Sequence, residues 1–193
     1  IPKVGWTFAD FEAAAKAATK DGKYGFGIGM GGFQWQALPI AKGGVQPVTQ
    51  DGQLQLTNAD FVAAAEWYAG LVTEQKIAAP VASASDTGWG ENQFTGENAA
   101  MAVDGTWNAV GYLNNDAGFK AGLVPLPSGD KGNLSLILGS GYGIAKNCDN
   151  KEAALKVLGS LLSKDAQDSI ASSGRSYPAR KKKKTMYFES LDE

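Results

Sequence analysis

Residues 94–107 read FTGENAAMAVDGTW, and this stretch determines how the rest of the chain is interpreted. The small apolar run Ala99–Val103 predicts a strand, and Asp104-Gly105 predicts the turn that ends it. Trp107 then stands near the start of a short helix predicted over 106–114. Open α/β sheets bind ligands beyond the carboxyl ends of their strands, which is where this indole would lie. Packing of Trp107 into the core remains an open alternative.

Helices and strands alternate on both sides of this stretch. Two Thr-x-x-Asp motifs, at Thr7 and Thr57, precede apolar residues at helical spacing; the hydroxyl can cap the helix and the acid suits its dipole. The predicted helices span 7–19, 57–75, 91–96, 106–114, 149–162 and 164–172. Strands are predicted over 24–29, 99–103 and 119–125, an extended segment over 134–145, and loops over 29–44, with one helical turn at most, and 78–90. This alternation predicts an α/β fold.

The composition excludes several classes of function. The chain has 193 residues, of which 44% are hydrophobic, and this suits one globular domain or two small lobes. Its net charge of −2 argues against a general nucleic-acid surface. It has no histidine, which excludes serine–histidine and cysteine–histidine catalysis and histidine-based metal sites. Cys148, the one cysteine, is interpreted as an incidental thiol, and no apolar run reaches the roughly 18 residues of a membrane span.

Two glycine-rich segments are candidate ligand-binding loops. The first carries Phe33 and Trp35 beside glutamines whose amides suit hydroxyl groups. The second reads GSGYG over 139–143, where glycines would let the backbone bend or approach a ligand closely. It lacks the Lys-Ser/Thr of a phosphate-binding loop. The alternative for the first segment is a loop that caps the core.

An enzyme is the rival interpretation. A glycosidase needs two carboxylates about 5–10 Å apart across the sugar, and Glu97 with Asp104 could be nominated. Nothing in their spacing favours this, so both are interpreted as turn or capping residues. The basic run over 180–184 is interpreted as a solvated surface segment.

Several motifs in this order resemble one known family. They are WTFADF at 6–11, F-x-x-G-x-x-A-M at 94–101 with Trp107 following, GLVPLP at 122–127, the 139–143 glycines, NKEAA at 150–154, and Tyr-Pro at 177–178 after Gly174. Over about residues 4–179 the chain resembles the extracellular solute-binding proteins of sugar ABC transporters, which are similar to maltose-binding protein.

The resemblance implies an α/β lobe of the periplasmic-binding-protein-like (type II) fold, with a mixed sheet flanked by helices. Residues 1–138 would form the second lobe of a two-lobed receptor, and residues 139–193 the hinge crossing and a returning helical segment. Family members are about twice as long, so the chain is expected to be a fragment that lacks the first lobe. The implied ligand-binding residues are Trp107, Trp35, Phe33, Ser140, Gly141, Tyr142 and Arg175.

The implied function is binding of a mono- or oligosaccharide for an importer, without catalysis, metal or cofactor. The expected partners are the sugar and the importer's membrane permease subunits, with no nucleic acid, and the expected state is a monomer. The expected location is periplasmic or extracellular, with a lipid anchor at the N-terminus of the precursor. A receptor of the same fold for another solute, such as a polyamine, an iron complex or a phosphodiester, remains an alternative.

Overall fold

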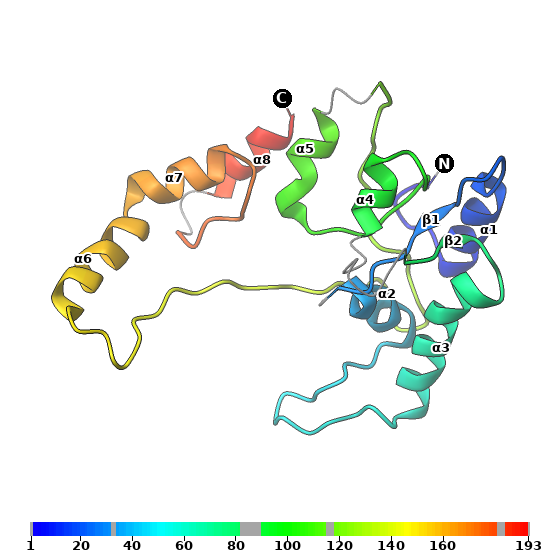
Figure 1. The fold of residues 1–193 in the computed structure, drawn as a ribbon, viewed down its shortest axis with the longest axis horizontal. Helices are drawn as coiled ribbons and strands as arrows, with labels where there is room; N and C mark the ends of the chain where they lie inside the picture. Colours follow the sequence, from blue (N-terminus) through cyan, green and yellow to red (C-terminus); the bar gives the residue numbers. More distant parts are fainter. Residues whose placement is uncertain (1, 32–33, 82–89, 115–117, 181–183, 193) are drawn as a thin grey trace. The chain divides into compact units, whose positions relative to one another are not determined.

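Two units make up the chain in the computed structural model, which describes residues 2–31, 34–81, 90–114, 118–180 and 184–192 (Figure 1). Unit 1 comprises Ile1–Asp104 and Val124–Ile137, and unit 2 comprises Gly105–Leu123 and Leu138–Glu193. The division into lobes 1–138 and 139–193 stays a prediction.

Two helices of unit 1 begin at polar caps, as the Thr-x-x-Asp motifs predict. At α1 (Phe8–Ala18), the hydroxyl of Thr7 accepts a hydrogen bond from the Asp10 amide at 3.2 Å, and the Asp10 carboxylate accepts one from the Thr7 amide at 2.8 Å. Hydrogen bonds from the Thr7 side chain and backbone lower the pKa of Asp10. At α3 (Ala59–Thr73) the prediction of Thr57 as the cap was wrong, because the side chain of Asn58 accepts the first free amides instead.

Residues 34–43 form α2 (Gln34–Gly43), so the prediction of a loop with one helical turn at most was wrong there. Pro39 lies inside this helix and removes a backbone donor, which ordinarily costs about 3 kcal/mol. The five residues from Ala37 to Ala41 are all buried, and α2 packs against α3. Burial of this continuous apolar run offsets the free-energy cost of the proline. A local sequence motif does not predict that burial, because it depends on tertiary packing.

A short parallel sheet lies at the centre of unit 1. β1 (Phe26–Gly27) pairs with β2 (Ala78–Ala79), and bridges join it to the segment 99–102. The amide of Phe26 donates to Ile77 at 3.0 Å, while that of Gly27 donates to Met101 at 2.8 Å. Successive amides of a strand point in opposite directions, so β1 lies between its two neighbours.

The strand predicted over 24–29 is therefore in place but shorter, whereas the segment predicted as a strand over 99–103 forms only isolated bridges, at Ala99 and Ala102. β2 falls in the predicted loop 78–90, of which 82–89 lie outside the described residues. The strand predicted over 119–125 was wrong, since no strand forms there. Leu123 and Val124 are exposed, and among the described residues no strand pairs with them to bury their apolar side chains.

Aromatic side chains form the core of unit 1. Phe11 of α1 meets Phe26 of β1 edge to face at 5.2 Å between ring centroids, and Phe8 meets Trp67 of α3 at 5.1 Å. The ammonium of Lys42 lies 4.8 Å from the Trp67 ring centroid, in cation–π range. These contacts fix α1 and α3 on the sheet.

The backbones of β1 and α4 (Gly90–Thr95) touch directly. A Cβ atom at Gly27 would overlap the Gly90 carbonyl, and a Cβ at Gly90 would overlap the Gly27 carbonyl. Only glycine at both positions permits this approach. The helix predicted over 91–96 is thus confirmed, and the glycine pair seats its first turn against β1.

Unit 2 is helical in its regular parts. It contains η1 (Thr106–Asn108), α5 (Ala109–Leu113), α6 (Lys151–Leu161), α7 (Lys164–Ser172) and α8 (Lys184–Asp192). The helices predicted over 106–114, 149–162 and 164–172 are confirmed, whereas α8 was not predicted. At α6 the cap is Asn150 rather than the expected Asp149, because the Asn150 side chain accepts the Ala153 amide at 3.0 Å.

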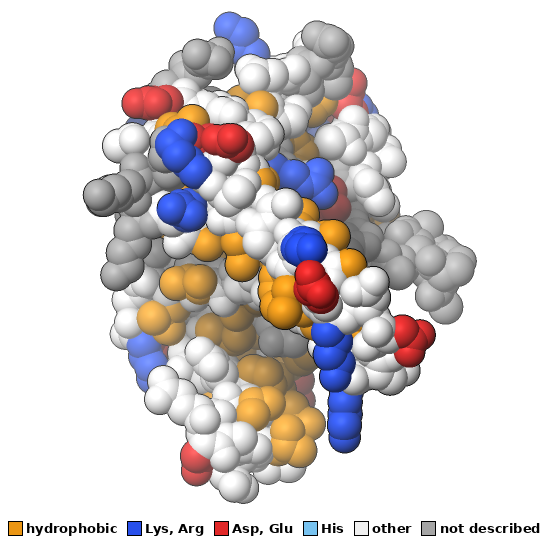
Figure 2. Space-filling view, turned by 90° about the vertical axis from the view of Figure 1, so that its left-hand side faces the viewer, with side chains coloured by type: hydrophobic (Ala, Val, Ile, Leu, Met, Phe, Trp, Pro, Cys, Tyr) orange, Lys and Arg blue, Asp and Glu red, His pale blue; other side chains and the backbone are white. Residues whose placement is uncertain are grey.

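The apolar side chains of α6 are not buried. None of the eleven residues of α6 is buried, and Leu155 is 59% exposed. Figure 2 shows hydrophobic side chains, in orange, at the surface of the face that it views. The helix is held by local contacts, including the Glu152–Lys156 ion pair at 2.9 Å.

Candidate functional site

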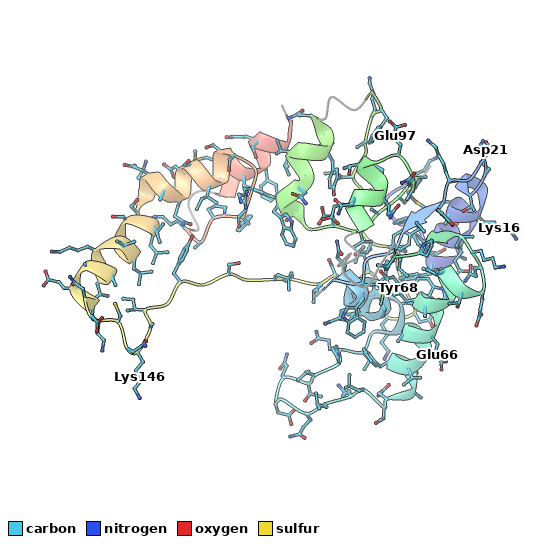
Figure 3. The ribbon with its side chains drawn as sticks, in the orientation of Figure 1. Lys16, Asp21, Glu66, Tyr68, Glu97 and Lys146 are labelled. Carbon is cyan, nitrogen blue, oxygen red and sulfur yellow. The ribbon has the colours of Figure 1, made fainter. Side chains whose placement is uncertain are left out.

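A buried hydroxyl holds the end of the central strand. Tyr68 of α3 donates a hydrogen bond from its hydroxyl to the Gly29 carbonyl at 2.7 Å and accepts one from the Gly29 amide at 3.0 Å. Burial raises the pKa of Tyr68 well above its ordinary value. Figure 3 shows Tyr68 among the packed side chains of unit 1, whereas Glu66 of the same helix lies at the periphery.

Gln34, the first residue of α2, lies directly against this strand end. A Cβ at Gly29 would meet the Gln34 side chain, so the glycine leaves the space that the amide occupies. Gln34 is only 1% exposed. Its Nε2 donates to Glu91 Oε2 at 2.8 Å and approaches the Val103 carbonyl at 3.4 Å, while its Oε1 is buried and has no hydrogen-bond partner among the described residues.

The carboxylate of Glu91 is therefore held at the carboxyl ends of β1 and the 99–103 segment. Glu91 is half-buried at the start of α4. Burial raises its pKa, the Gln34 amide opposes that shift, and the negative charge of Asp104 adds to it. The sequence gives no sign of this pairing, because 57 residues separate Gln34 from Glu91. Gln34, one of the two glutamines whose amides suit hydroxyl groups, is buried and holds the Glu91 carboxylate.

Trp107 lies on η1, in unit 2, with its ring partly open. The indole is 38% exposed and folds back over Gly105, where a Cβ atom would overlap the ring. Gly105 therefore gives the indole a flat backbone surface to lie on. The same turn is tied to α8, since the hydroxyl of Tyr187 lies 3.5 Å from the Thr106 carbonyl.

The other predicted residues of unit 2 are accessible. Ser140, Gly141 and Arg175 are exposed, and Tyr142 is 57% exposed. Beside Gly139, Gly141 and Gly143 the space is open, and none has a left-handed φ. Neither packing within the described part of the chain nor backbone conformation requires glycine at these positions, so a close approach by another molecule remains their predicted use.

The predicted aromatic residues of unit 1 have a different setting. Trp35 is half-buried, lies against the core and meets Phe61 edge to face at 6.1 Å. Phe33 lies outside the described residues. Trp35 thus belongs to unit 1, whereas the other described candidates belong to unit 2. Their assignment to one ligand site stays a prediction.

The described residues give little support to a glycosidase site at Glu97 and Asp104 or to a metal site. Glu97 is exposed in the turn after α4 with φ of 58°, whereas it is Glu91 whose pKa responds to the charge of Asp104. Across the described ranges, no group of three or more Cys, Asp or Glu side chains could hold a metal ion. Among the helices described, none combines the length and apolar character of a membrane span.

Comparison with known proteins gives fold and family. The family model described as "Bacterial extracellular solute-binding protein" matches residues 1–168, and no curated protein matches the chain. Among solved structures, the ABC substrate-binding protein Lmo0181 from Listeria monocytogenes, in complex with cycloalternan, has a TM-score of 0.77 at 22% identity, covering 100% of this chain and 49% of that one.

Two maltose-type proteins are also similar in structure. The maltose/maltodextrin-binding domain MalE from Bdellovibrio bacteriovorus, bound to maltotriose, has a TM-score of 0.76 at 19% identity, covering 100% of this chain and 55% of that one. Maltose-bound MalE3 from T. maritima has a TM-score of 0.72 at 21% identity, covering 98% and 53%. The chain spans about half the length of these proteins, and its predicted periplasmic-binding-protein-like fold is confirmed. The match over residues 1–168 shows that the chain belongs to the bacterial extracellular solute-binding protein family.

Proposed function

We propose that this chain is part of a carbohydrate receptor that delivers a mono- or oligosaccharide to an ABC importer. The observation that carries the proposal is the fold shared over 98–100% of the chain with proteins solved with cycloalternan, maltotriose and maltose. The family's description as extracellular agrees with a receptor that acts in the periplasm or outside the cell.

Trp107 is the proposed stacking surface. An indole presents a large flat apolar face, and the C–H faces of a pyranose are also apolar, so the two can stack while sugar hydroxyls bond to polar neighbours. The partial exposure of Trp107 and its support on Gly105 suit this role. Trp35, Phe33, Ser140, Gly141, Tyr142 and Arg175 are proposed as further contacts.

The proposed receptor binds and releases its ligand without covalent chemistry, metal or cofactor. In a two-lobed receptor the sugar favours the closed form because it touches both lobes only there. The closed form would then dock on the importer's permease subunits. A monomeric receptor with an N-terminal lipid anchor on its precursor completes the proposal.

Calorimetric titration with maltose, maltotriose, cycloalternan and tagatose tests this function. Trp107→Ala should weaken binding of the best sugar by about 1–3 kcal/mol, the range of a buried aromatic contact. Trp107→Phe, which keeps a smaller ring, is the matched control and should retain most of the affinity. Tight binding of a peptide or a metal ion, with no response to any sugar, would contradict the proposal.

A further inference from the structure

Gln34 and Glu91 form a polar pair that core packing does not require. Gln34 occupies a position that is 99% buried, among buried apolar residues of α2, where an apolar side chain of the same size would fill the space. Its Nε2 donates to Glu91 at 2.8 Å, and its Oε1 is buried without a partner in the part of the chain that the structure describes. A buried acceptor without a donor loses its hydration and gains nothing in return.

This pairing fixes the position of a carboxylate. Two backbone features restrict Glu91: α4 begins against β1 through the contact of Gly27 with Gly90, and Gly29 leaves room for the Gln34 amide. Gln34 contacts only the Oε2 atom of the carboxylate. Glu91 is half-buried, and its carboxylate also accepts a hydrogen bond from its own backbone amide. Two carboxylate oxygens offer about four acceptor sites, so capacity remains for a hydrogen bond from a ligand.

The location of the carboxylate suits a ligand. Glu91 lies where the parallel segments β1 and 99–103 reach their carboxyl ends, the edge at which open α/β sheets bind small molecules. Asp104, whose negative charge acts on Glu91, ends the second of these segments.

We propose that Glu91 binds a hydroxyl group of the solute and that Gln34 is the positioning residue that holds it. This inference rests on the proposed function and adds to it a specificity-determining residue in unit 1. The Glu91 carboxylate accepts a hydrogen bond from the solute hydroxyl. Such a charge-assisted hydrogen bond is roughly twice as strong as a neutral one. Gln34 holds the carboxylate in position before the solute binds. The buried Oε1, which has no partner among the described residues, lowers the stability of the fold, and the fixed carboxylate geometry is what the protein gains from it.

Binding and unfolding of three variants test the proposal on the full chain. Titration with the four sugars named above should show affinity lower by about tenfold for Glu91→Gln and for Gln34→Met, a near-isosteric change without polar atoms. Glu66→Gln, the same change at an exposed carboxylate on α3, is the control and should bind as the wild type. Unchanged affinity in Glu91→Gln would overturn the inference.

The urea midpoint of Gln34→Met separates a positioning role from a structural one. Removal of the unpartnered acceptor should leave the midpoint unchanged or raise it, even where affinity falls. A lower midpoint with unchanged affinity would show that Gln34 is structural and would overturn the inference. If the wild type binds none of the sugars, the proposed function fails, and the midpoint alone decides: a fall overturns the pair's role, and an unchanged or raised midpoint supports it for another hydroxyl-bearing solute.

Discussion

The single hydroxyl of Tyr68 supports the strand end on which the polar pair rests, and its removal has a calculable effect. In Tyr68→Phe the Gly29 amide loses its acceptor and the Gly29 carbonyl loses its donor, both inside the core. Each buried group left unsatisfied costs about 1–3 kcal/mol. Since one hydroxyl serves both, we expect a total loss of about 2–4 kcal/mol in the free energy of unfolding.

Urea unfolding followed by circular dichroism measures this loss. With a slope of about 2 kcal/mol/M, the midpoint should fall by about 1–2 M while the slope stays constant. Tyr24→Phe is the control, because Tyr24 is only partly buried and no hydrogen bond of its hydroxyl is found among the described residues. Equal midpoints for the two variants would refute the reasoning, since the Gly29 groups would then have other partners.

Three further changes test individual features. Gly90→Ala should lower stability by about 1–3 kcal/mol because its Cβ overlaps the Gly27 backbone, whereas Gly159→Ala, in an open position on α6, should raise it slightly; thermal unfolding distinguishes them. Thr7→Ala removes the α1 cap and should cost about 1 kcal/mol by urea unfolding, with Thr7→Ser as the conservative control that retains the cap. Burial raises the pKa of Glu91 above its unfolded value, so the ionised carboxylate destabilises the fold at neutral pH. Relative to Glu91→Gln, the wild type should therefore gain stability as pH falls toward 4.5, and the pH dependence of the difference should vanish below it; a difference constant with pH would contradict this.

Capping motifs in the sequence predicted where three helices begin. The helices after Thr7, Asn58 and Asn150 follow from short polar residues that cap the first free amides, so their positions were predicted to within one or two residues. The exact cap differed in two of the three, because adjacent polar residues such as Asp149 and Asn150 compete for the same amides.

Tertiary packing decided what the sequence did not predict. The helix through Pro39 exists because a continuous run around it is buried against α3. β2 consists of two alanines and gains its strand conformation from β1. The pairing of Gln34 with Glu91 depends on glycines at 27, 29 and 90 that let three segments converge, and no spacing rule relates those positions. The motif around Trp107, in contrast, predicted the family. It left open whether the indole packs into the core, and the structure shows Trp107 38% exposed.

The outward-facing leucines of α6 have a consequence for how this helix acquires its order. An isolated helix of eleven residues is marginal in water, and α6 buries none of its own side chains. Its cap at Asn150 and its ion pair supply only small increments. A surface that covers Leu155 and Leu158 would therefore stabilise the helix when it binds. Ordering of α6 and association with that surface would then be thermodynamically coupled.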